Sequence, residues 1–253
     1  MDTPQDTAPA SSSLAGPLLL LAWLSLGAAL VRWPQFTGVL TFAFVMVGWV
    51  LAVAVHEFGH ALTAYVAGDH SVRAKGYLSF DPRRYTDLGV SIVIPLIALA
   101  LGGIGFPGGA VYLREDLMRS RAWRSLASLA GPFGTLVVLI VLTRAMPLAA
   151  GASTALYDAL AFLAFLQATA LVLNLAPIPG FDGYGAIRPW LPGAVARALA
   201  PIEGLAVIAF LGLLFLLPGA AALLFGAAFV ISESLDAPIH AVRAGWEAFR
   251  FWR

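Results

Sequence analysis

The chain has 253 residues, of which 60% are hydrophobic and 11% are charged. Soluble domains carry about 25% charged residues, so this composition excludes an ordinary soluble domain and indicates an all-α, polytopic membrane protein. The formal net charge of +1, with basic residues spread over the loops, predicts no nucleic-acid partner, and the absence of cysteine excludes disulfides and thiolate zinc ligands.

Both ends of the chain are predicted to lie outside the membrane domain. Residues 1–13 are polar and rich in Ser, Pro and Thr, so we expect a disordered tail there. They lack the basic segment of a signal peptide, and the apolar run behind them predicts a retained spanning helix over residues 14–31. Residues 236–253 interleave Trp and Phe with Arg, which is typical of an interfacial helix. We therefore assign one membrane domain to residues 14–235.

A candidate metal-binding motif lies in the next apolar run, residues 36–67, which reads His56-Glu57-Phe58-Gly59-His60 near its C-terminal end. Residues four apart share one face of a helix, so both imidazoles can bind a single Zn²⁺ with Glu57 beside it. Ionisable groups inside a bilayer are costly and usually functional. Two core histidines paired with neighbours are the simpler alternative, but the chain has only four histidines and two of them flank this glutamate.

A polar stretch follows this run, and it predicts a short β-hairpin strand near the site. Its apolar residues roughly alternate with polar ones, as in a strand with one buried face. The apolar set is Val72, Ala74, Leu78 and Phe80, and the polar set is Arg73, Lys75 and Ser79.

The rest of the chain predicts further spans, about six in all. Residues 88–106 are apolar but interrupted by Gly and Pro, so we expect a re-entrant segment that does not cross. Residues 125–142 and 155–176 are uninterrupted spans. Residues 201–235 are apolar with a break at Pro218, which we interpret as a hairpin of two short spans that returns the C-terminus to the side of the N-terminus.

Asp182 is a candidate third ligand because of what precedes it. The sequence from Asn174 to Gly183 reads N-L-A-P-I-P-G-F-D-G and follows a predicted span. The prolines end the helix and the glycines allow a tight bend, so the Asp182 carboxylate can be presented at membrane depth. An isolated Asp-Gly pair is commonly an ordinary turn, but its combination with a histidine pair in the membrane favours a ligand.

This combination resembles the site-2 protease family of intramembrane zinc metalloproteases, whose motifs are H-E-x-x-H on one helix and N-x-x-P-x-x-x-x-D-G on a later one. Ala130-Gly131-Pro132 is similar to a further family motif, and the stretch from Gly76 to Asp87 is similar to the compact bacterial subgroup without a PDZ domain. Thr135 and Tyr85 depart from that pattern, but neither is among the expected zinc ligands.

The resemblance implies a role for each motif residue. His56, His60 and Asp182 would hold one Zn²⁺ per chain, Glu57 would be the general base and acid, and Asn174 would lie near the substrate backbone. The implied activity is peptide hydrolysis within or near the transmembrane segment of a membrane-protein substrate, in regulated intramembrane proteolysis.

A helical substrate hides its amides in internal hydrogen bonds, so cleavage in the membrane requires local unwinding. We expect Gly108 and Gly109, or the predicted strand over residues 76–80, to offer an edge to which an extended substrate can pair. The alternative is that both stretches are plain loops.

The site also predicts the topology. His56, His60 and Asp182 must share one depth, which requires their two helices to run parallel and residues 88–106 not to cross. Loops on the active-site side would then hold most of the basic residues, so the positive-inside rule places the active site toward the cytoplasm, in a bacterial cytoplasmic membrane. The residues on that side are Arg73, Lys75, Arg83, Arg84, Arg114, Arg119, Arg121, Arg124, Arg188 and Arg197, with Arg243, Arg250 and Arg253 joining them through the hairpin.

Other functions fit the motif less well. An inactive zinc-binding scaffold or a metal transporter would also place His and Asp in the membrane, but a transport path would step through the bilayer instead of gathering its ligands at one depth. A CAAX-type membrane protease has a glutamate as third ligand, and the Asp182-Gly183 element argues against that family.

Overall fold

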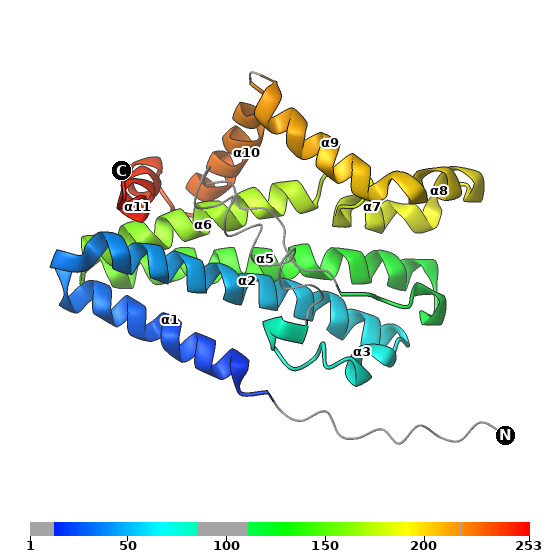
Figure 1. The fold of residues 1–253 in the computed structure, drawn as a ribbon, viewed down its shortest axis with the longest axis horizontal. Helices are drawn as coiled ribbons and strands as arrows, with labels where there is room; N and C mark the ends of the chain where they lie inside the picture. Colours follow the sequence, from blue (N-terminus) through cyan, green and yellow to red (C-terminus); the bar gives the residue numbers. More distant parts are fainter. Residues whose placement is uncertain (1–12, 85–110, 218) are drawn as a thin grey trace.

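The computed structural model describes residues 13–84, 111–217 and 219–253, and within these ranges it contains helices and no strand (Figure 1). The all-α prediction is therefore confirmed. The longer helices are α1 (Ala15–Arg32), α2 (Thr37–Ala67), α5 (Arg121–Ala150), α6 (Thr154–Asn174), α9 (Glu203–Leu216), α10 (Ala220–Ser234) and α11 (Ile239–Phe249). The short ones are η1 (Pro34–Phe36), α3 (Ser71–Ala74), η2 (Pro82–Arg84), η4 (Glu115–Leu117), α7 (Asp182–Ile187), η5 (Arg188–Trp190), α8 (Gly193–Leu199) and η6 (Ala200–Ile202).

Among the described residues, five helical segments are long and apolar enough to cross a membrane, or up to six if α10 and α11 count as one broken span. The chain is an integral membrane protein, and the predicted number of spans, about six, is confirmed. The five segments are Ala15–Arg32, Pro34–Ala67, Arg121–Ala150, Thr154–Asn174 and Gly193–Leu214.

The centre of the bundle is formed by α2, α5 and α6. Figure 1 shows α2 and α6 running in the same direction and α5 running against both. The backbones of α2 and α5 are in close contact, since a Cβ on Gly59 would lie 2.4 Å from the Ala130 carbonyl oxygen and one on Gly134 would lie 3.0 Å from that of Val55. Side chains larger than hydrogen at these positions would force the helices apart. This contact brings the histidines of α2 against α5.

The predicted parallel arrangement of the two ligand-bearing helices is thus confirmed. The connection between α2 and α5 starts and ends at one end of the bundle, where the Arg119 amide donates to the Ala67 carbonyl over 3.0 Å and Lys75 Nζ donates to the Tyr112 carbonyl over 2.7 Å. The predicted re-entrant segment, residues 88–106, lies outside the described residues and stays a prediction.

The predicted β-hairpin strand after α2 is wrong. Residues 71–74 form α3, and backbone turns follow, including a hydrogen bond from the Tyr77 amide to the Val72 carbonyl. The cause is Asp69, whose buried carboxylate accepts the Ser71 amide over 3.1 Å and the Ser71 hydroxyl over 2.5 Å. An Asp that bonds to the backbone two residues later favours a turn over an extended chain.

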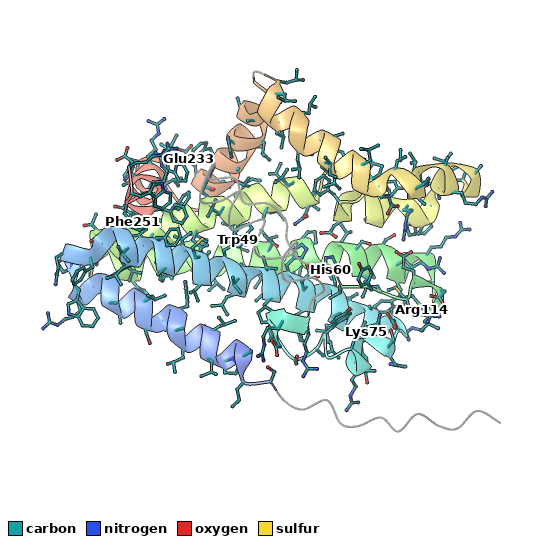
Figure 2. All side chains as sticks on the ribbon, in the orientation of Figure 1. Trp49, His60, Lys75, Arg114, Glu233 and Phe251 are labelled. Carbon is teal, nitrogen blue, oxygen red and sulfur yellow. The ribbon has the colours of Figure 1, made fainter. Side chains whose placement is uncertain are left out.

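The C-terminal part also differs from the prediction. The chain does break between α9 and α10, where Gly219 has a φ of +89°. However, α10 does not return to the end where α9 begins: Asp236, just after it, lies 3.5 Å from Arg144 near the C-terminal end of α5. The predicted return of the C-terminus, with Arg243, Arg250 and Arg253, to the active-site side is therefore wrong. Figure 2 shows Phe251 at the end of the bundle opposite Lys75 and Arg114.

The C-terminal helix α11 bends by 117° from α10 and packs on α6 and α2. Phe249 is fully buried, and a Cβ on Gly245 would lie 2.2 Å from the Asp158 carbonyl oxygen. Trp252 remains half exposed. One face of the predicted interfacial tail is thus buried against the bundle, which leaves only the rest for contact with lipid.

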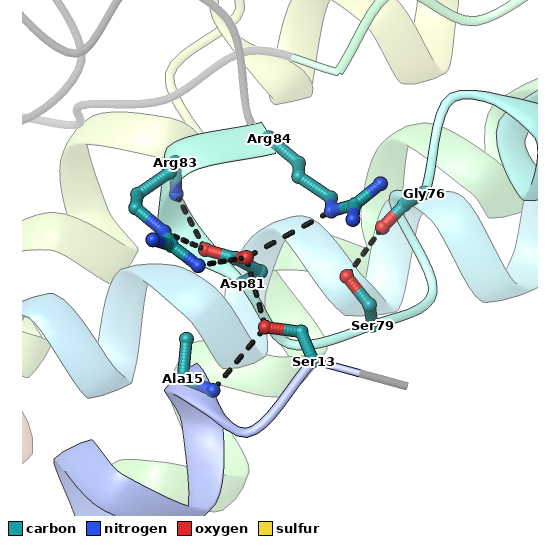
Figure 3. Close-up of polar contacts among 7 residues, drawn as sticks. All are labelled: Ser13, Ala15, Gly76, Ser79, Asp81, Arg83 and Arg84. Atoms are coloured by element: carbon teal, nitrogen blue, oxygen red, sulfur yellow. Dashed lines mark hydrogen bonds and ion pairs between the residues drawn. The ribbon is translucent and has the colours of Figure 1, made fainter. Parts of the chain in front are cut away.

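A polar cluster ties the start of α1 to the segment after α3 (Figure 3). The buried Asp81 carboxylate accepts two hydrogen bonds from the Arg83 guanidinium, at 2.9 and 2.8 Å, and one from the Ser13 hydroxyl at 2.8 Å. Beside it, the rings of Phe80 and Phe58 stack at 4.0 Å, which places this segment against α2. The Arg83 guanidinium, with help from Ser13, holds the pKa of the Asp81 carboxyl well below its usual range.

This cluster predicts a pH-dependent contribution to stability. Because the folded pKa of Asp81 is lowered, its stabilisation is complete above the unfolded pKa, about 3.9, and is lost as the pH falls through the folded value. Asp81→Asn should lower the thermal unfolding temperature near neutral pH, and the difference from wild type should shrink below about pH 4. The exposed Asp116, paired with Arg114, provides the control Asp116→Asn, which should change little. A difference for Asp81→Asn that is constant with pH would contradict this role.

The arrangement of the helices predicts which residues share a side of the membrane. Since the chain has no cysteine, single cysteines can be labelled without background. Arg73→Cys and Arg121→Cys, both at exposed positions, should be labelled from one side, and Ala152→Cys from the other. Labelling of the first two from opposite sides would contradict the parallel arrangement of α2 and α6.

Candidate metal centre

Three side chains from two distant parts of the chain converge within the bundle. His56 and His60 lie one turn apart on α2, and Asp182 is the first residue of α7. The two Nε2 atoms are 3.0 Å apart, Asp182 Oδ2 lies 3.2 Å from His56 Nε2, and Asp182 Oδ1 lies 3.3 Å from His60 Nε2. This set is a candidate metal site, as the sequence predicts.

Contacts on the far side of each imidazole define how the rings face the centre. His60 Nδ1 lies 2.7 Å from the Ala127 carbonyl oxygen, which can only accept, so Nδ1 carries the proton. In a neutral ring the lone pair is then on Nε2 and points at the other ligands. His56 Nδ1 lies 2.9 Å from the Thr135 hydroxyl, an equivalent contact on the same helix, α5.

The geometry fits a zinc ion. When both rings are neutral with the proton on Nδ1, two nitrogen lone pairs and a carboxylate face one another, and a bound cation turns this repulsion into attraction. Ligands about 2.0 Å from a tetrahedral Zn²⁺ lie about 3.3 Å from one another, close to the observed separations. Imidazole and carboxylate are also ligands that zinc accepts.

Gly131 on α5 provides the space in which the two imidazoles meet. A Cβ at this position would lie 2.2 Å from His60 Nε2 and 2.6 Å from His56 Nε2. Gly131 is the middle residue of Ala130-Gly131-Pro132, so the motif has a physical explanation. It removes the side chain from the point where α5 approaches the ligand atoms.

The chain reaches Asp182 through two close turns after α6. Gly180 has a φ of +98°, a left-handed conformation that favours glycine. A Cβ on Gly183 would lie 2.2 Å from the Leu175 carbonyl oxygen, so only glycine fits where the chain folds back on the end of α6. The turns predicted from these glycines are therefore present, and they place Asp182 opposite the histidines.

A cavity opens beside the three ligands, and Glu57 lies in its wall. Glu57 is 2% exposed, and its Oε2 accepts the Val111 amide over 3.1 Å. Asn174, the last residue of α6, is also buried and lines the cavity. The predicted substrate-binding residues Gly108 and Gly109 lie outside the described residues. The cavity is lined by Trp49, Ala52, Val53, His56, Glu57, His60, Val111, Leu113, Ser128, Thr135, Gln167, Ala170, Asn174, Gly180, Phe181, Asp182 and Val207.

Several residues of the site are not among those that the sequence analysis selected. Thr135 departs from the family pattern, and its hydroxyl lies 2.9 Å from His56 Nδ1. Asp69 holds the segment that carries Val111, because its Oδ2 accepts the Arg114 amide over 2.7 Å. Gln167 and Trp49 line the cavity. Gln167 could have been noticed as an amide within an apolar span, where polar groups are costly.

Comparison with known proteins identifies relatives along most of the chain. It is 43% identical over 239 residues to "Putative zinc metalloprotease Rip2" of Mycolicibacterium smegmatis and 44% identical over 233 residues to the protein of that name in Mycobacterium tuberculosis H37Rv. Each alignment covers 92% of this chain and 88% of the relative. "Putative zinc metalloprotease YwhC" of Bacillus subtilis is 29% identical over 69% of this chain and 81% of its own length. No family model and no solved structure matches the chain.

Gly131 provides a test of the packing around the ligands. Gly131→Ala should displace the imidazoles and reduce bound zinc to a small fraction of one equivalent per chain, as measured by metal analysis of the purified protein. The matched control is Gly212→Ala on α9, where nothing lies within 4 Å of the new Cβ, and it should retain wild-type zinc. Full zinc occupancy in Gly131→Ala would show that α5 does not constrain the centre.

Proposed function

The chain belongs to the site-2 protease family of zinc metalloproteases, and we propose that it hydrolyses peptide bonds within or near the transmembrane segments of other membrane proteins. The observation that carries this proposal is the position of Glu57. Its buried carboxylate lines the same cavity as His56, His60 and Asp182, at a depth where a carboxylate without a function would be costly.

Each residue has a defined task in this proposal. His56, His60 and Asp182 would hold Zn²⁺, which when bound polarises a carbonyl and makes water a better nucleophile. Three protein ligands leave a tetrahedral position for the reactants. Thr135 and the Ala127 carbonyl orient the imidazoles, and such outer contacts fix the tautomer of a ligand.

Glu57 is the proposed general base and acid. It would take a proton from the attacking water and pass it to the amine that leaves when the peptide C–N bond breaks, so that one water is consumed per bond. The hydrogen bond from the Val111 amide to Oε2 fixes the direction of the carboxylate. Oε1 has no hydrogen-bond partner among the described residues and would take the proton.

The segment that follows Val111 supports an extended substrate. Val111 and Leu113 line the cavity while Tyr112 between them is 69% exposed, the alternation of an extended chain. Asp69 and Lys75 hold this segment through the Arg114 amide and the Tyr112 carbonyl. We propose that an unwound substrate lies alongside it, by backbone pairing of the kind seen in strand addition.

The proposed location is a bacterial cytoplasmic membrane with the site toward the cytoplasm. Most of the basic loop residues lie at the end of the bundle where α2 ends, and the positive-inside rule places that end in the cytoplasm. The smaller basic set at the other end is Arg32, Arg144, Arg243, Arg250 and Arg253. Because Arg243, Arg250 and Arg253 lie at this other end, the excess of basic residues at the end where α2 ends is smaller than predicted, but it remains.

Glu57→Gln tests the proposal, because it keeps the size of the side chain and removes the proton acceptor. Cleavage of single-span substrates in proteoliposomes should fall by at least about a hundredfold while zinc is retained. Glu233→Gln, the same change at an exposed position on α10, is the control and should cleave like wild type. Undiminished turnover by Glu57→Gln would place the base elsewhere, and wild-type protein that cleaves no substrate in a broad panel would contradict the proposed function.

A further inference from the structure

The cavity extends past the metal centre to two polar groups that the proposed chemistry does not use. Trp49 and Gln167 both line it, and each is only 2% exposed. Within the described part of the chain, neither Trp49 Nε1 nor Gln167 Nε2 has a hydrogen-bond partner. Burying an N–H group without an acceptor destabilises a protein, so each of these donors requires an acceptor from whatever occupies the cavity. Two such donors in one cavity indicate that something with an acceptor binds there.

The packing of α2 on α6 gives the depth of these donors. A Cβ on Gly48 would lie 2.5 Å from Leu163 Cδ2, so these two residues are level on the parallel helices. Depth is measured here along the helix axis, away from the end of the bundle where α2 ends. With a rise of 1.5 Å per residue, Gln167 lies about 6 Å deeper than His56, and Trp49 lies about 10 Å deeper than His56. Figure 2 shows Trp49 and His60 at separate levels along α2.

The chemistry of the two groups limits the ligand. An indole nitrogen is only a donor, and Nε2 of the glutamine amide likewise donates. These two donors therefore match an acceptor such as a carbonyl oxygen. A transmembrane helix that unwinds for cleavage exposes carbonyl oxygens that have lost their partners, in surroundings without bulk water. Donors placed in the cavity wall would stabilise that unwound state.

We propose that Trp49 and Gln167 form a positioning subsite for a carbonyl oxygen of the substrate, two to three residues from the scissile bond on the side deeper in the membrane. An extended chain advances about 3.3 Å per residue, so two to three residues cover the distance from the ligands to these donors. This inference rests on the proposed function and adds to it a substrate class: segments that are unwound beyond the cleaved bond. Within the described residues, no hydrogen bond joins Trp49 or Gln167 to a metal ligand, so we expect both to act on binding.

The first test measures binding without cleavage. The probe is a synthetic peptide with a Leu/Ala segment of about 20 residues interrupted by an Asn-Gly pair, and its affinity is measured for Glu57→Gln protein in proteoliposomes. Adding Gln167→Leu or Trp49→Phe should weaken binding about three- to tenfold, the effect of losing one neutral hydrogen bond, while zinc is retained. Unchanged affinity in both would overturn the subsite and leave these donors to water.

The control is Thr41→Val, also on α2. Like the two donors, the Thr41 hydroxyl is buried and has no hydrogen-bond partner among residues 13–84, 111–217 and 219–253, but it does not line the cavity. This variant should bind the peptide as the Glu57→Gln parent does. A loss equal to that of Gln167→Leu would show that any buried polar change in the bundle weakens binding, which would contradict a specific subsite.

The second test identifies the carbonyl and separates this inference from the proposed function. In the cleavage assay, Gln167→Leu should raise KM about three- to tenfold and change kcat less than about twofold. In one modified peptide, an ester replaces the amide two or three residues from the scissile bond, on the side deeper in the membrane, because an ester carbonyl is a weaker acceptor. If the subsite binds the backbone, this peptide should be cleaved less well by wild type but not by Gln167→Leu. In a second peptide Leu replaces Asn, and it should show the same difference between the two proteins if the subsite binds the Asn side chain. If wild type and Gln167→Leu respond equally to both replacements, the proposal is overturned. Weaker binding by Gln167→Leu with no cleavage by wild type would instead retain the subsite and reject the protease.

Discussion

The site depends on one electrostatic constraint, the gathering of three electron-rich ligand groups at one point inside the bundle. His56 Nε2 and His60 Nε2 lie 3.0 Å apart, and they lie 3.2 and 3.3 Å from the two oxygens of the Asp182 carboxylate. Contacts on the outer side of each ring orient Nε2 toward this point. A metal cation bound among them makes this arrangement favourable. Zinc bound at this point would link α2 to the start of α7, across about half of the sequence.

Glycine makes the rest of the site possible, because the ligands can meet only where helices approach closely. Gly59 and Gly134 bring the α2 and α5 backbones together, and Gly131 leaves room for both imidazoles. Gly183 lets the chain after α6 fold back so that Asp182 faces them. A bilayer offers little hydrophobic drive between helices, so such close packing is what holds the bundle together.

The ligand set and the parallel direction of its two helices could be predicted from the sequence. Residues four apart share one face of a helix, and ligands of one metal must lie at one depth in the membrane. The turn after α2 could not be predicted, because the alternation of apolar residues there indicates a strand, whereas the hydrogen bonds of the Asp69 carboxylate stabilise a turn. The side reached by the C-terminus depends on how far two short helices travel, which a hydropathy break does not reveal. The roles of Thr135 and Trp49 depend on the packing of α2 against α5 and α6, which a sequence motif does not reveal, whereas Gln167 is visible in the sequence as an amide within an apolar span.

The most direct measurement of the account is the zinc content of purified wild-type protein beside that of the double variant His56→Ala, Asp182→Ala. The account predicts about one zinc per chain in wild type and almost none in the variant, since a single imidazole cannot hold the metal tightly. Full occupancy in the variant, or none in wild type purified without chelator, would contradict the assignment of these residues to a common metal centre.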